Sequence, residues 1–107
     1  KYAGFNGNGY ATGNRLKDAQ FIEPYGMTVT SDGDIYVINR AGSFISRISG
    51  DQVDVVAGKP GTSGETNSDA EPLDARFNSP QDIAADSEDN FYIAGGWDRT
   101  VRKLSIE

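Results

Sequence analysis

Short runs of apolar and β-branched residues alternate along this chain with clusters of glycine, aspartate, asparagine and serine. In the first half, this pattern predicts strands over residues 26–30, 35–38, 44–48 and 53–57. In the second half, it predicts strands over residues 82–85, 91–94 and 100–106. No segment keeps the 3.6-residue period of an amphipathic helix. We therefore expect an all-β chain that folds as four-stranded antiparallel meanders.

The second predicted strand is apolar at four successive positions, Ile35 to Ile38, and does not alternate with polar residues. A strand of that kind is covered on both faces. Antiparallel sheets that stack face to face produce this pattern, as the blades of a propeller do, whereas a sandwich with one wet face favours stricter alternation. We therefore expect the sheets to stack.

The chain nearly repeats itself at a constant offset of 56 positions, as from Asp18 to Asp74. Three matched segments share that offset: Asp18-Ala19-x-Phe21-x-x-Pro24 with Asp74-Ala75-x-Phe77-x-x-Pro80, Tyr36-Val37-Ile38 with Tyr92-Ile93-Ala94, and Ile45-Ser46-Arg47-Ile48 with Val101-Arg102-Lys103-Leu104. A repeat of this length indicates that each copy is one supersecondary unit, which buries its apolar face on a neighbouring unit.

Each copy also carries Ala-Gly ahead of a glycine-rich stretch (Ala3-Gly4 and Ala57-Gly58) and an Asp-Gly or Asp-Asn turn before its tyrosine strand. In this order of motifs the chain resembles the NHL-repeat β-propellers. The resemblance implies two four-stranded antiparallel blades of a propeller, often six-bladed in that family, that is incomplete in this chain. The chain departs from the family pattern at Asn39 and Gly95, where an aspartate is usual, and at Asp82, which replaces a glycine.

The resemblance also predicts how the chain is divided. Residues 1–4 are expected to be the end of the preceding blade's outer strand, residues 5–58 blade one with its long entry loop, and residues 59–107 blade two without its fourth strand. Two blades cannot close a ring. The remaining blades are therefore expected from the same parent chain or from a homo-oligomer. Similar propellers in bacterial surface proteins that handle glycans imply an extracytoplasmic or cell-surface location.

Composition narrows the classes of function. The chain of 107 residues has 16 acidic and 10 basic residues, a net charge of −6, which argues against nucleic-acid binding and against binding to anionic membranes. No apolar run approaches the about 18 residues of a membrane span. Cysteine and histidine are absent, which removes thiolate chemistry and the commonest general base and zinc ligand. We predict no cofactor and no metal: the aspartate turns lack the ligand spacing of calcium loops, and the glycine-rich stretch lacks that of a dinucleotide site.

In an up-and-down meander, every second connection emerges at the same end of the sheet. This parity of the strands predicts that one end of the meanders gathers the residues best suited to bind a ligand. Those candidate ligand-binding residues are Arg15, Tyr25, Arg40, Arg76, Asn78, Trp97, Asp98 and Arg99. An exposed indole can stack on a sugar ring or anchor a protein, and arginines can hold carboxylate or sulfate groups. The alternative is that Trp97 covers a blade edge and that the arginines are solvated surface charges. We expect a non-catalytic binding or scaffold module for a carbohydrate or protein ligand.

The alternative hypothesis is that the chain is part of an enzyme, a propeller hydrolase or lyase with its site on the central axis. Without histidine or cysteine, such a site needs paired carboxylates, a carboxylate-bound metal, or a lysine or tyrosine base. The acidic residues expected near the mouth of the propeller are Asp18, Glu23, Asp74 and Asp82. No residue is assigned a catalytic role.

Overall fold

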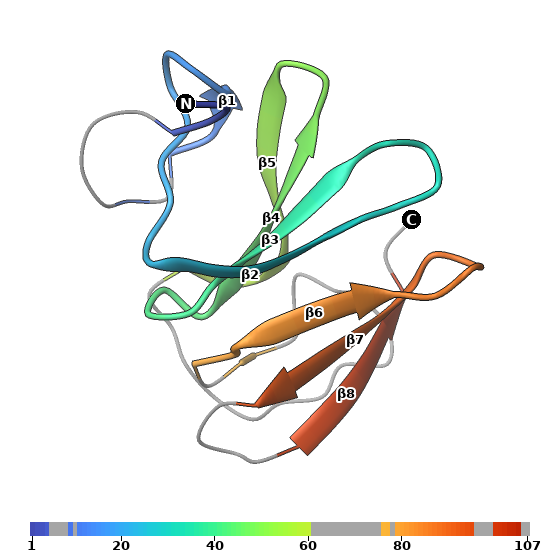
Figure 1. Cartoon of the computed structure of the whole chain (residues 1–107). Helices are drawn as coiled ribbons and strands as arrows, with labels where there is room; N and C mark the ends of the chain where they lie inside the picture. Colours follow the sequence, from blue (N-terminus) through green and yellow to red (C-terminus); the bar gives the residue numbers. More distant parts are fainter. Residues whose placement is uncertain (5–8, 10, 61–75, 78, 96–99, 106–107) are drawn as a thin grey trace.

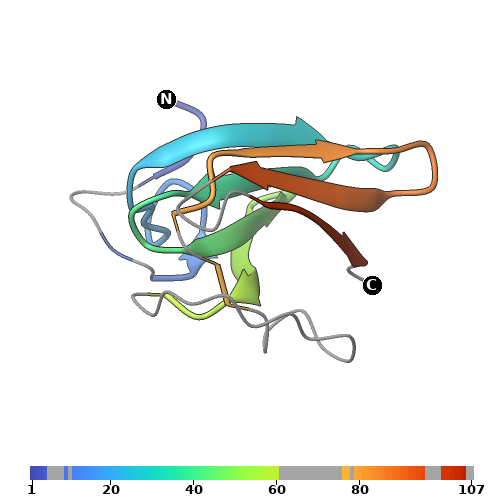
Figure 2. The same cartoon turned by 90° about the horizontal axis from the view of Figure 1, so that it is seen from below.

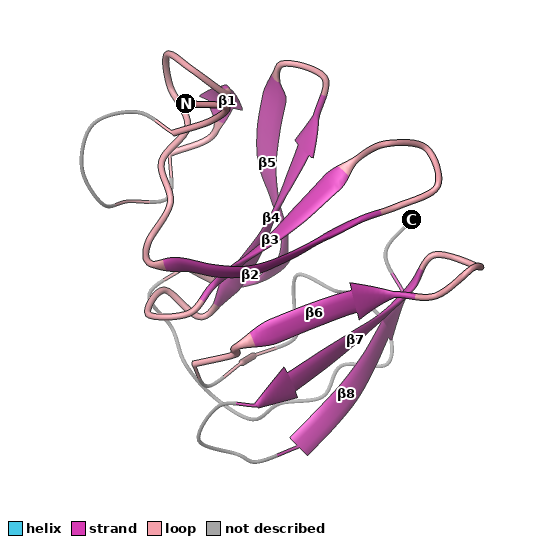
Figure 3. Ribbon diagram, viewed as in Figure 1, coloured by secondary structure: helices cyan, strands magenta, loops and turns pink. Residues whose placement is uncertain are grey.

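The computed structural model describes residues 1–4, 9, 11–60, 76–77, 79–95 and 100–105. All regular structure in these residues is β (Figure 3), so the all-β prediction is confirmed. The strands are β1 (Gly13–Asn14), β2 (Pro24–Val29), β3 (Ile35–Asn39), β4 (Phe44–Ser49), β5 (Gln52–Gly58), β6 (Asp82–Ala85), β7 (Asn90–Gly95) and β8 (Thr100–Ser105). Seven of them lie where the sequence predicted strands.

The strands form two antiparallel sheets. Strands β2 to β5 follow one another as a meander, and β1 adds to the free edge of β5, which gives the order β1-β5-β4-β3-β2. The second sheet has the order β6-β7-β8 in the part of the chain that the structure describes. Strand β1 was not predicted, since its two residues have no β propensity of their own. Its pairing with β5 holds it in place.

The two sheets pack against each other and diverge away from their shared edge (Figure 1). Strands β2 and β6 lie side by side, and the view from below shows the same arrangement (Figure 2). The approach is closest at Gly26, where a Cβ atom would stand 2.8 Å from the carbonyl oxygen of Gln81 and 3.0 Å from the Cα atom of Asp82. A glycine is therefore required there for steric reasons.

The space between the sheets is filled by an apolar core. The first sheet contributes Tyr36, Ile38, Ile45 and Ala57, and the second sheet and the segment before it contribute Phe77, Ile83, Phe91 and Ile93. The rings of Tyr36 and Phe91 lie 4.4 Å apart at a tilted angle, a favourable arrangement for two aromatic rings.

A second cluster covers the opposite face of the first sheet. It consists of Ala19, Val37, Ile48 and Val53, with Ala3, Phe21 and Ile35 packed against it. The segment before β2 thus covers the face that the second sheet leaves free. Because Tyr36 and Ile38 face one cluster while Ile35 and Val37 face the other, β3 is buried on both sides, as its continuous apolar run predicted.

The two copies of the sequence repeat also share backbone conformation and packing contacts. Gly4 and Gly58 both adopt positive φ angles (111° and 77°), and each lies against the repeated phenylalanine, Phe21 or Phe77. At Gly58 a Cβ atom would stand 2.8 Å from the Ser43 carbonyl oxygen, so a larger residue does not fit. The expected similarity between Ala3-Gly4 and Ala57-Gly58 therefore extends to their contacts.

Candidate functional site

The register of the strands defines two ends of the molecule. At one end, which we call the loop end, Pro24 pairs with Asn39, and Asp82 pairs with Ala94. The β3–β4 and β7–β8 connections both leave from this end, because Asn39 pairs with Phe44 and Gly95 with Thr100. At the other end, the turn end, lie the tight turns between β2 and β3, β4 and β5, and β6 and β7.

A cluster of Glu23, Tyr25 and Arg40 occupies the loop end of the first sheet, and we call it the Tyr25 cluster. The Arg40 guanidinium lies over the Tyr25 ring, 4.8 Å from its centroid, and its Nε donates a hydrogen bond to Glu23 Oε1. The backbone N–H of Arg40 also donates to the Glu23 carbonyl at 3.1 Å. Tyr25 is 61% exposed. The cluster therefore presents an aromatic face, a paired cation and a carboxylate to solvent.

The backbone of Glu23 is in the left-handed region, with φ at 51°. Ser79, its counterpart 56 positions later, has φ at 52°. A non-glycine residue in this conformation is unfavourable and often marks a functional site. Here the same conformation occurs in both copies, so it belongs to the repeat, where it turns the chain into β2 and β6.

Asn39 lies directly beneath the Tyr25 cluster and is completely buried. Its Oδ1 accepts from the Ile22 backbone N–H at 2.9 Å, and its Nδ2 donates to Ser46 Oγ at 3.0 Å and to the Val37 carbonyl at 3.3 Å. The side chain thus holds the entry to β2 against the end of β3. In the sequence, Asn39 was noted only because it departs from the family pattern. The role of Asn39 in positioning the Tyr25 cluster was not predicted.

Arg15 lies at the turn end, so the expectation that it shares one end with Arg40 was wrong. Its Nε pairs with Asp51 Oδ1 at 3.0 Å, and its guanidinium lies 4.4 Å from the centroid of the Tyr2 ring and donates to the Tyr2 carbonyl. Strand β1 ends immediately before it, beside Gln52. The connection before β2 runs from one end of the sheet to the other, which parity alone does not reveal. Arg15 therefore fastens this connection to the β4–β5 turn.

The other candidate residues are described only in part. Arg76 is half-buried, and its carbonyl accepts a hydrogen bond from Arg102 Nη1 at 2.5 Å. Arg102 in turn lies over the Phe77 ring, 4.7 Å from its centroid, so the backbone of Arg76 is held against β8. The remaining candidates, Asn78, Trp97, Asp98 and Arg99, lie outside the residues that the structure describes.

The acidic residues expected near the propeller mouth make separate contacts. Asp18 accepts from the Asn14 N–H at 3.1 Å, Glu23 pairs with Arg40, and Asp82 accepts from the Ile83 N–H at 2.9 Å. Asp74 is outside the described residues. In the described part of the chain, no three acidic, histidine or cysteine side chains stand together as ligands for a metal ion. Nor does that part contain a helix of the length and apolarity that a membrane crossing requires.

The aspartates of the turn end act as turn-forming residues. Asp86 accepts backbone hydrogen bonds from Asn90 and Glu88 at 3.0 and 2.9 Å, and a further one from the Tyr92 hydroxyl at 3.1 Å. These bonds, that from Asn90 above all, lower the pKa of Asp86. In the first sheet the Thr30 hydroxyl lowers the pKa of Asp32 in the same manner. These carboxylates accept hydrogen bonds within their own turns. We therefore assign them the structural role of stabilising the hairpin turns.

No family model and no curated protein matches the chain by sequence. Among solved structures, a protein of unknown function from Bacteroides thetaiotaomicron superposes with a TM-score of 0.89 at 32% identity, over 99% of this chain and 27% of that one. A protein from the same organism, described as an auxiliary nutrient-binding protein, superposes with a TM-score of 0.78 at 26% identity, over 94% of this chain and 26% of that one. The chain therefore spans about a quarter of the length of either neighbour.

Proposed function

We propose that the chain is part of an NHL-type β-propeller that serves as a non-catalytic binding module, with its loop end turned toward a carbohydrate. Two findings support the proposal: the nutrient-binding description of one structural neighbour, and the Tyr25 cluster at the loop end. The NHL assignment rests on the sequence motifs, with residues 5–58 and 59–107 as its two blades.

The exposed ring of Tyr25 is the observation that carries this proposal. An aromatic face can stack on the C–H face of a sugar ring, while nearby polar groups bond to its hydroxyls. Arg40 and Glu23 stand beside the ring with side chains that are 37% and 43% exposed, so both have donors or acceptors open to solvent. Because the two charges compensate each other, the cluster is formally neutral on an otherwise acidic protein. This combination favours a neutral polysaccharide over an acidic one.

The β7–β8 connection extends the proposed site. It leaves from the same end of the molecule and holds Trp97, Asp98 and Arg99, which we propose as further ligand-binding residues together with Arg76 and Asn78. An extracytoplasmic or cell-surface location agrees with such a ligand and with the nutrient-binding neighbour.

Electrophoresis in native gels that contain amylopectin, galactomannan or xyloglucan tests the proposal, with polygalacturonate as the acidic comparison. We expect the chain to be retarded by at least one neutral polysaccharide, and Tyr25→Ala to weaken the apparent affinity about tenfold or more. Arg40→Ala should weaken it severalfold.

The turn end offers a matched control, because Arg15 covers the Tyr2 ring at 4.4 Å much as Arg40 covers Tyr25. Tyr2→Ala should leave the retardation unchanged. Circular dichroism checks that each variant compared has an intact fold. Equal losses for Tyr2→Ala and Tyr25→Ala, or no retardation by any of the three neutral polysaccharides, would contradict the proposed site.

A further inference from the structure

Among the residues that the structure describes, none covers one of the two faces of the second sheet. On this face lie Tyr92 and Val101, which are 38% and 73% exposed, with Ala84, Ala94 and Lys103 around them. Their counterparts 56 positions earlier are Tyr36 and Ile45, which the second sheet buries to 6% and 0%. The residues of this open face are therefore of the type that the first sheet uses to pack against a neighbouring sheet.

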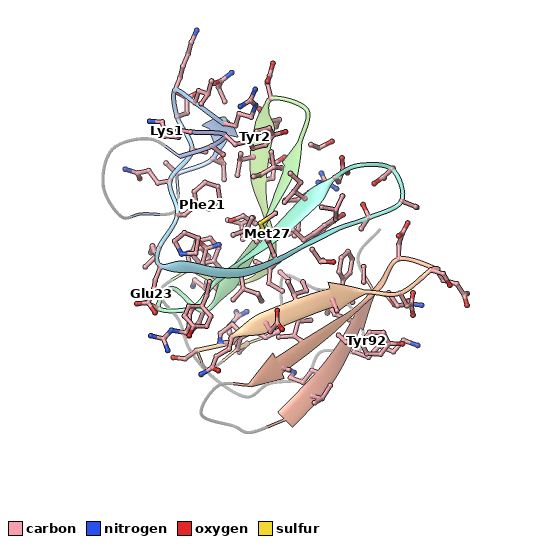
Figure 4. All side chains as sticks on the ribbon, viewed as in Figure 1. Lys1, Tyr2, Phe21, Glu23, Met27 and Tyr92 are labelled. Carbon is pink, nitrogen blue, oxygen red and sulfur yellow. The ribbon has the colours of Figure 1, made fainter. Side chains whose placement is uncertain are left out.

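The first sheet has an open area on its opposite face. Met27 and Val29 of β2 are 58% and 54% exposed, and their cross-strand partners are Val37 and Ile35, which belong to that face. The counterpart of Met27 is Ile83, which is only 3% exposed because the first sheet covers it. Figure 4 shows Met27 on the side of β2 turned away from the second sheet, and Tyr92 on the side of the second sheet turned away from the first.

These two open faces correspond to the two halves of the interface that the chain already contains. Inside the molecule, the Tyr36 face of the first sheet packs on the Ile83 face of the second. The Tyr92 face repeats the first of these surfaces, and the Met27 face repeats the second. The Tyr92 face stands exposed at one end of the two-sheet stack and the Met27 face at the other, so the two ends are complementary to each other.

We propose that the chain associates head to tail with a second copy of itself, the Tyr92 face of one copy packing on the Met27 face of the next. The contact is heterologous, since two different surfaces meet, and it continues from copy to copy until a ring closes. The internal interface supplies the template: Tyr92 meets Ile35 of the second copy as Tyr36 meets Phe91 within the chain. The hydrogen bond from the Tyr92 hydroxyl to Asp86 holds the tyrosine side chain over its own sheet.

Sedimentation equilibrium in about 0.15 M salt, which screens the repulsion between chains of net charge −6, tests the proposal. The wild-type chain should show an average mass that rises with concentration above its 11.5 kDa monomer. Met27→Glu and Val101→Glu each place a charge at an already exposed position, so folding is preserved, and each should shift association to at least tenfold higher concentration. Mixed in equal amounts, the two variants should form a 1:1 dimer, because each retains the face that the other lacks.

Leu16→Glu is the matched control, since Leu16 is an exposed apolar residue that belongs to neither face, and it should associate as the wild type does. A wild-type chain that stays monomeric at about 1 mM would overturn the proposal, because association weaker than that is not a specific interface. So would a mixture of the two glutamate variants that contains only monomers, or variants that associate as strongly as the wild type.

Discussion

At the scale of single residues, the loop end depends on one buried amide. Asn39 offers an acceptor to the Ile22 N–H and two donors to Val37 and Ser46, so all of its described polar contacts lie within the fold. A buried polar group contributes to stability only while its partners are present. Gly95 stands at the equivalent position of the second copy, so the repeat gave no indication that this residue acts as an anchor.

Replacing Asn39 by alanine should lower the free energy of unfolding by about 2–3 kcal/mol, because it leaves the Ile22 N–H without its acceptor and creates a small cavity. Asn39→Asp keeps the acceptor, so near pH 4 it should lower the free energy of unfolding less than Asn39→Ala does. Urea unfolding followed by circular dichroism measures both values. Ser46→Ala is the control, since it removes only one partner; a loss for Asn39→Ala no larger than that of Ser46→Ala would contradict the anchoring role.

At the scale of strands and turns, the sequence predicted the strands of the two antiparallel sheets well and the path of the long connection poorly. Strands β2 to β8 were predicted because β-branched and aromatic residues reveal them locally. The placement of Arg15 was wrong because the connection before β2 has no periodicity, and its course is fixed by long-range contacts such as that between Arg15 and Asp51. The Tyr25 cluster was anticipated in part, since parity placed Tyr25 and Arg40 at one end, but their contact with Glu23 depends on the positive φ angle of that residue.

The β6–β7 turn should make stability depend on pH in a known direction. The pKa of Asp86 is lowered in the folded state by the Asn90 N–H and its other donors, so the folded state binds protons less readily than the unfolded chain. This stabilising contribution is complete above the ordinary pKa of about 3.8 and is lost as the pH falls through the lower folded value. The difference in unfolding free energy between wild type and Asp86→Ala should therefore shrink from pH 6 to pH 3 in urea titrations. The same shrinking difference should appear when Asp86→Ala is made in a Glu88→Ala background, because that background keeps the backbone N–H that Asp86 binds.

At the scale of the whole molecule, each sheet has two faces built for packing, and the chain buries only part of them. Stability in such stacked units is a sum of the units and the interfaces between neighbours. The segment before β2 covers part of the first sheet's outer face, but Met27 and the Tyr92 face stay open. A neighbour on either face would add to stability, so the unfolding free energy of this chain should rise with its concentration.

The close contact of β2 with β6 leads to a gain-of-association prediction. Within the chain, Gly26 allows β2 to approach the backbone of Gln81 and Asp82. Head-to-tail association places Asp82, the counterpart of Gly26, against Tyr25 and Gly26 of the next copy. Its Cβ atom and its charge then keep the two strands apart. Asp82→Gly should therefore strengthen self-association about tenfold in sedimentation equilibrium, equivalent to about 1.4 kcal/mol.

Asp82→Ala separates the two causes, because it removes the charge but keeps the Cβ atom. If the close approach of the strands is what limits association, alanine should recover only a small part of the gain that glycine gives. An equal gain for both variants would show that the charge alone opposes the contact. No gain for Asp82→Gly would mean that the junction between two copies does not reproduce the one between β2 and β6, and the internal interface would then be the wrong template for it.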